Sequence, residues 1–94
     1  MVTLDDVLAA AEQIAGRMHR TPTFSSATLG EGVWLKAELF QKTGSFKVRG
    51  VLNKLASLSL EEKARSVIGI SAGNHAQALA WGAAAEGIDC LVVM

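Results

Sequence analysis

The sequence contains a single cysteine, Cys90, and therefore cannot form an intramolecular disulfide. It has no excess of charge of either sign, because nine basic and nine acidic side chains cancel, and no block of like charge occurs. This argues against nucleic acid and membrane surfaces as partners. No apolar run is long enough to cross a bilayer, and the first eighteen residues lack the basic start and apolar stretch of a secretory signal. We therefore expect a cytoplasmic protein.

Hydrophobic residues make up 50% of the 94 positions, which is enough for the packed core of one small domain. Apolar residues at helical spacing, with Thr3 and Asp6 as a capping box, predict a first helix over about residues 4–16. The segment 19–32 holds the only proline and is expected to be connecting chain with at most a short strand. Alternating apolar residues predict a strand over residues 33–39.

The second half of the chain has the pattern of an α/β protein. A helix is expected over about residues 45–56, and Ser59 with Glu62 predicts the start of a short helix. A strand-helix-strand (βαβ) unit follows, with its elements over residues 67–70, 74–86 and 89–93. The alanine-rich helix of this unit permits close approach to a neighbouring element.

The segments VIGI at 67–70 and CLVV at 90–93 are continuously apolar, which is typical of strands in a parallel sheet covered on both faces. Sheets commonly have about five or six strands, and this chain supplies three or four. We therefore expect either that a partner completes the sheet or that the chain is a truncated part of something longer.

Lys47 follows Gly44, Ser45 and Phe46 at the expected start of the second helix. The positive end of the helix dipole disfavours an ammonium there, and burial would further favour the neutral amine, which can form a Schiff base with an aldehyde. Phe46 offers an aromatic face for a planar ring. The alternative is a solvated lysine on an ordinary helix, which is what we expect of Lys36, Lys42, Lys54 and Lys63.

The segment from Ser71 to His75 lies where a strand ends and a helix begins, the usual ligand position in open α/β sheets. Gly73 permits a tight turn, and the free backbone N–H groups from Ala72 onward would point toward a carboxylate or phosphate. Asn74 adds an amide donor. The alternative is an ordinary helix cap made by Ser71 or Asn74.

Neither histidine is assigned a chemical role from the sequence. His75 could be a general base, but a histidine one residue into a helix is more commonly a hydrogen-bonded structural group. No metal site is expected, because His19 and His75 are isolated and Cys90 has no partner at ligand spacing. Cys90 is expected to be a buried small hydrophobic side chain.

Three segments carry a family resemblance: RTP at 20–22, KAELFQKTGSFKVRG at 36–50 and SAGNHAQALA at 71–80. They resemble the amino-terminal region of the threonine and serine dehydratases, which are fold type II (tryptophan synthase beta-like) enzymes that use pyridoxal 5′-phosphate (PLP). The resemblance implies that residues 1–65 begin the larger PLP-binding domain, with the Schiff-base lysine helix. It implies that residues 66–94 begin the small mobile domain, which is incomplete. The loop for the PLP phosphate would lie in a later part of the sequence.

The resemblance also implies roles for individual residues. Lys47 matches the catalytic lysine that holds PLP as a Schiff base and moves the Cα proton of the substrate. Phe46 matches the residue packed against the cofactor ring, and Asn74 matches the asparagine that hydrogen-bonds its phenolic oxygen. The loop that binds the substrate carboxylate corresponds to Ser71, Ala72, Gly73, Asn74 and His75.

The reaction implied is β-elimination from L-threonine or L-serine, giving an α-keto acid and ammonia, in an enzyme that is a homo-oligomer by family analogy. Sulfhydrylases are less similar, because they carry a Thr-Ser-Gly-Asn-Thr turn. Serine racemases have an acid/base serine at the position of Ala72, so we expect at most weak racemase activity. The alternative from another class is a catalytically silent α/β fragment or interaction module that associates through its exposed sheet edge.

Overall fold

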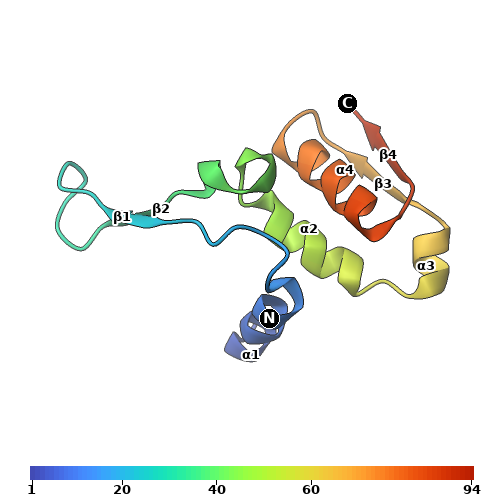
Figure 1. Ribbon diagram of the computed structural model, residues 1–94, viewed down its shortest axis with the longest axis horizontal. Helices are drawn as coiled ribbons and strands as arrows, with labels where there is room; N and C mark the ends of the chain where they lie inside the picture. Colours follow the sequence, from blue (N-terminus) through green and yellow to red (C-terminus); the bar gives the residue numbers. More distant parts are fainter.

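The core lies between two helices, α2 (Lys47–Ala56) and α4 (Asn74–Glu86). The computed structural model describes residues 1–94, and Figure 1 shows these helices side by side in its body. The predicted apolar stripe of α2 is confirmed, because its four buried residues are Val48, Val51, Leu52 and Leu55. From α4 the core receives mainly small side chains, together with Leu79. The predicted close approach of the alanine-rich helix is thus confirmed.

The predicted βαβ unit is also confirmed. Strand β3 (Val67–Ile70) pairs in parallel with β4 (Cys90–Val93), and α4 connects the two and covers one face of the pair (Figure 1). Gly87 ends α4 in the left-handed conformation, with φ of 67°, which a glycine adopts without steric cost.

Only one face of this sheet is covered within the chain. Half-buried residues, Cys90 among them, alternate along both strands with exposed ones, so Cys90 is less buried than expected. The exposed side chains all belong to the face opposite α4, and they are Ile68, Ile70, Leu91 and Val93. The chain therefore leaves an apolar sheet face open to solvent.

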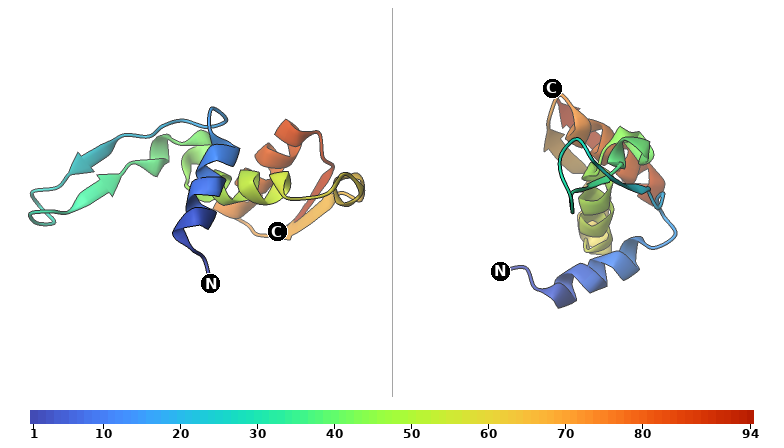
Figure 2. Two further views of the ribbon diagram at one scale, coloured as in Figure 1. Left: turned by 90° about the horizontal axis from the view of Figure 1, so that it is seen from below. Right: turned by 90° about the vertical axis from the view of Figure 1, so that its left-hand side faces the viewer.

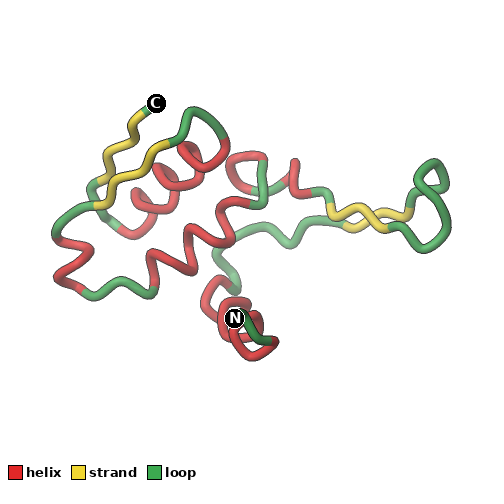
Figure 3. The backbone as a smooth tube through the Cα atoms, turned by 180° about the vertical axis from the view of Figure 1, so that it is seen from behind, coloured by secondary structure: helices red, strands yellow, loops and turns green.

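An extended arm projects from this body (Figures 1 and 2). It is an antiparallel pair of β1 (Thr23–Ser25) and β2 (Trp34–Lys36), with Phe24 opposite Leu35. The two strand pairs are separate sheets, as Figure 3 shows.

The strand predicted over residues 33–39 is shorter in the structure. The backbone leaves the strand at Ala37, with φ of −79° and ψ of 68°, and continues as a 3₁₀ helix, η1 (Glu38–Phe40). The apolar alternation did not mark a buried face, because Leu35 and Leu39 are both exposed. The prediction was wrong in length because the alternation continued past the point where the arm joins the body.

The two capping boxes predicted from the sequence are present. Helix α1 (Leu4–Ile14) begins after Thr3, whose hydroxyl accepts a hydrogen bond from the backbone N–H of Asp6 at 3.2 Å. Helix α3 (Leu60–Ala64) begins in the same way after Ser59. Helix α1 lies beside α2 and buries none of its residues fully (Figure 2). None of the helices is both long and apolar enough to span a membrane.

Candidate active site

Lys47 is the first residue of α2 and its side chain is exposed. Its backbone N–H donates to the Ser45 hydroxyl at 3.4 Å, and its Nζ lies 5.1 Å from the centroid of the Phe46 ring. The expected position at a helix N-terminus is confirmed, whereas the expected burial is not found within these 94 residues.

A strained turn precedes Lys47. It is a 3₁₀ helix, η2 (Lys42–Gly44), in which both Thr43 and Gly44 have left-handed backbone conformations, with φ of 60° and 71°. Left-handed backbone is unfavourable for a β-branched residue such as Thr43. The Thr43 hydroxyl is also buried without a hydrogen-bond partner. Strain of this kind persists only where the surrounding structure holds it.

The side chain of Gln41 holds the start of this turn. It is 4% exposed, and its amide group exchanges two hydrogen bonds with the backbone of His19, at 3.0 Å and 2.7 Å. Its oxygen also accepts from the N–H of Lys42 at 2.9 Å. Gln41 therefore joins two segments of chain that are 22 residues apart.

The second predicted motif, Ser71–His75, connects β3 to α4. The Ser71 N–H donates to the carbonyl of Val93 at 3.0 Å, and the Ser71 hydroxyl accepts from the N–H of Gly73 at 3.2 Å. The helix cap is Gly73, which has no side chain to satisfy the first turn, so neither Ser71 nor Asn74 caps α4. The N–H groups of Asn74 and His75 have no acceptor in the chain and remain available to a ligand.

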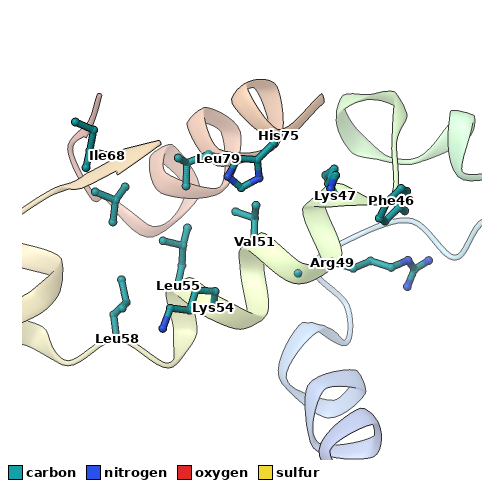
Figure 4. Close-up of a pocket in the computed structure, with 12 residues that line it drawn as sticks. Phe46, Lys47, Arg49, Val51, Lys54, Leu55, Leu58, Ile68, His75 and Leu79 are labelled. Atoms are coloured by element: carbon teal, nitrogen blue, oxygen red, sulfur yellow. The ribbon is translucent and has the colours of Figure 1, made fainter. Parts of the chain in front are cut away.

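A cavity of about 600 Å³ between α2, β3 and α4 brings parts of the two motifs together. Phe46, Lys47 and His75 line it at one end, whereas Leu58 and Ile68 line the other (Figure 4). The remaining motif residues, which do not line the cavity, are Ser71, Ala72, Gly73 and Asn74. The same cavity is thus lined by Lys47 and by His75, which is the one residue of the second motif that reaches it.

Gly69 of β3 makes room for the side chains of α4 at this cavity. A Cβ atom at Gly69 would lie 2.5 Å from Leu79 Cδ2 and 3.9 Å from His75 Nε2. The imidazole of His75 therefore lies against the backbone of β3.

Sequence reasoning missed a polar cluster next to the lysine helix. Glu38 accepts two hydrogen bonds from the Arg49 guanidinium, at 2.9 Å and 2.8 Å, and a third from the buried Thr21 hydroxyl. The hydrogen bonds from Arg49 are the main reason that the pKa of Glu38 falls from 4.5 to about 2. In the strand predicted over residues 33–39, Glu38 would lie on the face opposite the alternating apolar residues. The only signal was that Thr21, Glu38 and Arg49 all stand inside the segments that carry the family resemblance.

Two of the lysines expected to be solvated have hydrogen-bond partners. Lys36 Nζ donates to the carbonyl of Thr21 at 3.0 Å and lies 3.9 Å from Glu38. Lys63 lies 3.4 Å from Glu86, which also pairs with Arg17. Thr21 and Glu86 come from distant parts of the chain, so the sequence did not indicate these two contacts, and Lys36 itself remains exposed.

Comparison with known proteins supports the resemblance. The model of the family "Pyridoxal-phosphate dependent enzyme" matches residues 14–94. The L-threonine ammonia-lyase of Thermotoga maritima is 46% identical, over 100% of this chain and 24% of its own length. Human serine racemase is 43% identical, over 99% of this chain and 29% of its own length. The structure of maize serine racemase superposes with a TM-score of 0.87 at 39% identity, over 96% of this chain and 30% of that one.

The chain thus spans 24–30% of the length of these relatives. The likeness in fold is that of a partial α/β domain of fold type II, with a parallel sheet. Because the family model covers most of the chain and the identities exceed 40% over its whole length, the chain belongs to the family of pyridoxal-phosphate dependent enzymes.

Proposed function

We propose that this chain is the lysine-bearing part of a PLP-dependent threonine or serine dehydratase, which converts the amino acid to an α-keto acid and ammonia. The observation that carries the proposal is that Lys47 and His75, from the two motifs, line one cavity. The similarity of this chain to an L-threonine ammonia-lyase supports this choice of reaction. The proposal includes residues 1–65 as the start of the PLP-binding domain and 66–94 as the start of a smaller domain.

The residues present fit the cofactor. The exposed amine of Lys47 is accessible to an aldehyde, and the neighbouring ring of Phe46 is itself 59% exposed, which leaves its surface free for a planar ring. We assign Lys47 as the covalent anchor, Phe46 as the residue packed on the cofactor ring and Asn74 as a donor to its phenolic oxygen. When bound, PLP supplies an electron-accepting ring that makes the Cα proton of an amino acid acidic.

The chain's own groups then have distinct tasks. The amine of Lys47, once free, accepts the Cα proton as a general base. The substrate carboxylate binds at the start of α4, where the unpaired N–H groups of Asn74 and His75 and the positive end of the helix dipole favour an anion. We assign this task to Ser71, Ala72, Gly73, Asn74 and His75.

A racemase is the second candidate, because human and maize serine racemases are among the similar proteins. Racemisation needs a proton donor on the face opposite the base. Ala72 stands where the resemblance places the acid/base serine of racemases, and a methyl group cannot carry a proton. This favours elimination.

The experiment that tests the assignment of Lys47 is mapping of its reaction with PLP. The chain is mixed with PLP, reduced with borohydride and digested, and the pyridoxyl group is located by peptide mass. Lys54 is the matched control, because it belongs to the same helix and lines the same cavity. We expect Lys47 to be labelled in preference to Lys54, and Lys47→Ala to lose that label while Lys54→Ala keeps it. Equal labelling of all five lysines would contradict the assignment.

The choice of reaction is tested in a complete enzyme that carries this segment. We expect release of α-keto acid from L-threonine or L-serine, which is abolished by Lys47→Ala, and little formation of the D-amino acid. We expect Ala72→Ser to increase racemisation. A wild-type enzyme that racemises as fast as it eliminates would favour the second candidate.

A further inference from the structure

We propose that the ion pair between Glu38 and Arg49 fixes the first turn of α2 and thereby positions Lys47. The inference rests on the proposed function of Lys47, and it assigns Glu38 and Arg49 as positioning residues that do not touch the substrate. The pair connects the base of the arm, at η1, to the helix that carries the lysine.

The geometry of the pair favours a precise arrangement. Arg49 binds both oxygens of Glu38 with two different nitrogens, at 2.9 Å and 2.8 Å. Two parallel hydrogen bonds of this kind define orientation as well as distance. The Glu38 side chain is only 16% exposed, and Thr21 binds it from a third direction.

Helix α2 has no cap of its own at this end. Its N-cap residue is Phe46, which makes no side-chain cap hydrogen bond, and no acidic residue occurs in its first turn. Instead, the first turn carries the cations of Lys47 and Arg49, which the positive end of the helix dipole disfavours. Glu38 supplies the missing negative charge from a neighbouring element, and so takes the role that an acidic residue at a helix start usually has.

Arg49 contributes to the lining of the cavity, but its guanidinium is turned toward Glu38 rather than toward Lys47. Residues two apart on a helix are separated by about 200° around its axis. Figure 4 accordingly shows the Arg49 side chain extending away from the side chain of Lys47. The pair therefore holds the helix start without binding the Lys47 amine, which remains free to react.

The chain between Glu38 and Lys47 needs to be held at both ends, because it contains the left-handed Thr43. Gln41 holds one end through the backbone of His19. The other end is held by the hydrogen bond of the Lys47 N–H to Ser45 and by the Glu38–Arg49 pair. Loss of the pair would allow the strained turn to relax and the first turn of α2 to fray.

Amide hydrogen exchange of the unliganded chain tests this directly. In Glu38→Gln we expect exchange in residues 46–50 to be faster by roughly tenfold or more, since a hydrogen bond to a charged group is lost, while exchange in α4 changes little. Arg49→Lys, which keeps the charge but not the two-pronged bond, should give a smaller increase. The matched control is Glu86→Gln, which removes an ion-paired carboxylate on the far side of the body and should leave residues 46–50 unchanged.

Unchanged exchange in residues 46–50 of Glu38→Gln would overturn the inference. So would an equal increase in every peptide, because the pair would then contribute only to global stability.

The reaction with PLP separates this inference from the proposed function. If Lys47 is preferred over Lys54 in the wild-type chain, Glu38→Gln should reduce that preference by several-fold and Glu86→Gln should not. If the wild-type chain shows no preference, the proposed function of Lys47 fails, whereas the exchange result still decides whether the pair fixes the helix start.

Discussion

Gly82 of α4 lies against Val51 of α2 so closely that a Cβ atom at position 82 would be 2.7 Å from Val51 Cγ1. The same atom would be 3.3 Å from Leu55 Cδ1. The spacing of the two helices therefore depends on the absence of a side chain at Gly82. Because these helices carry Lys47 and His75 at their starts, that spacing also determines the width of the cavity between them.

We predict that Gly82→Ala destabilises the chain. Helix propensity favours alanine by about 1 kcal/mol, but overpacking of a core costs about 1–3 kcal/mol. Since Val51 and Leu55 are both buried and can move little, we expect a net loss of about 1 kcal/mol in the free energy of unfolding, measured in urea. Gly50→Ala is the control, because a Cβ there has no neighbour within 4 Å. The free energy of unfolding of Gly50→Ala should rise by about 0.5–1 kcal/mol. If Gly50→Ala were instead destabilised, the loss in Gly82→Ala could not be attributed to overpacking alone.

We predict that Glu38 contributes to stability against acid. Its pKa is lowered from 4.5 to about 2, so its contribution is complete above pH 4.5 and is lost as the pH falls through about 2. Above pH 4.5 the wild type should be more stable than Glu38→Gln by about 1–3 kcal/mol in the free energy of unfolding. This difference should disappear as the pH is lowered through about 2. Urea titrations at a series of pH values measure this difference. The pKa of Glu86 is lowered as well, mainly by its hydrogen bond with Arg17. Because Glu86 is present in both the wild type and Glu38→Gln, its titration does not change the difference between them. A difference independent of pH would exclude the ionised carboxylate as the cause.

We predict a modest, salt-sensitive coupling between Arg17 and Glu86, which are 69 residues apart in the sequence. Their side chains are partly exposed, so a double-mutant cycle with Arg17→Gln and Glu86→Gln should give about 0.5–1 kcal/mol. The coupling should shrink at about 1 M salt, where charges are screened within roughly 3 Å. Lys63 is the second cation on Glu86. A cycle that pairs Lys63→Gln with Arg17→Gln should show little favourable coupling.

We predict that the open face of the β3–β4 sheet promotes association of the 94-residue chain. Ile70 is 83% exposed and Leu91 is 59% exposed on this face. Replacing both by threonine, which retains the preference for strand, should reduce binding of a hydrophobic dye and concentration-dependent association. The free energy of unfolding should change by less than about 0.5 kcal/mol for each exposed site. Val92→Thr on the covered face is the control and should destabilise instead, by about 1–3 kcal/mol. Undiminished association of the double variant would show that another surface is responsible.

Local signals in the sequence predicted the elements with their own start and stop residues. Thr3 with Asp6 and Ser59 with Glu62 form capping boxes as expected, and α4 ends at Glu86 as expected, with Gly87 as its C-cap. The parallel βαβ unit was predictable as well, because its strands are continuously apolar and its helix is bounded by glycines. All of these signals act over a few residues, so they do not depend on the rest of the fold.

The amino-acid sequence by itself thus determined the α/β class, the helix that carries Lys47 in its first turn and the three segments that carry the family resemblance. Only the tertiary structure decided that the strand after Val33 ends at Lys36, that Lys47 is exposed and that Glu38 pairs with Arg49. The reason is physical. Burial and ion pairing depend on which distant segments meet, and the alternation of apolar residues along the arm is the same whether a neighbouring element covers it or water does.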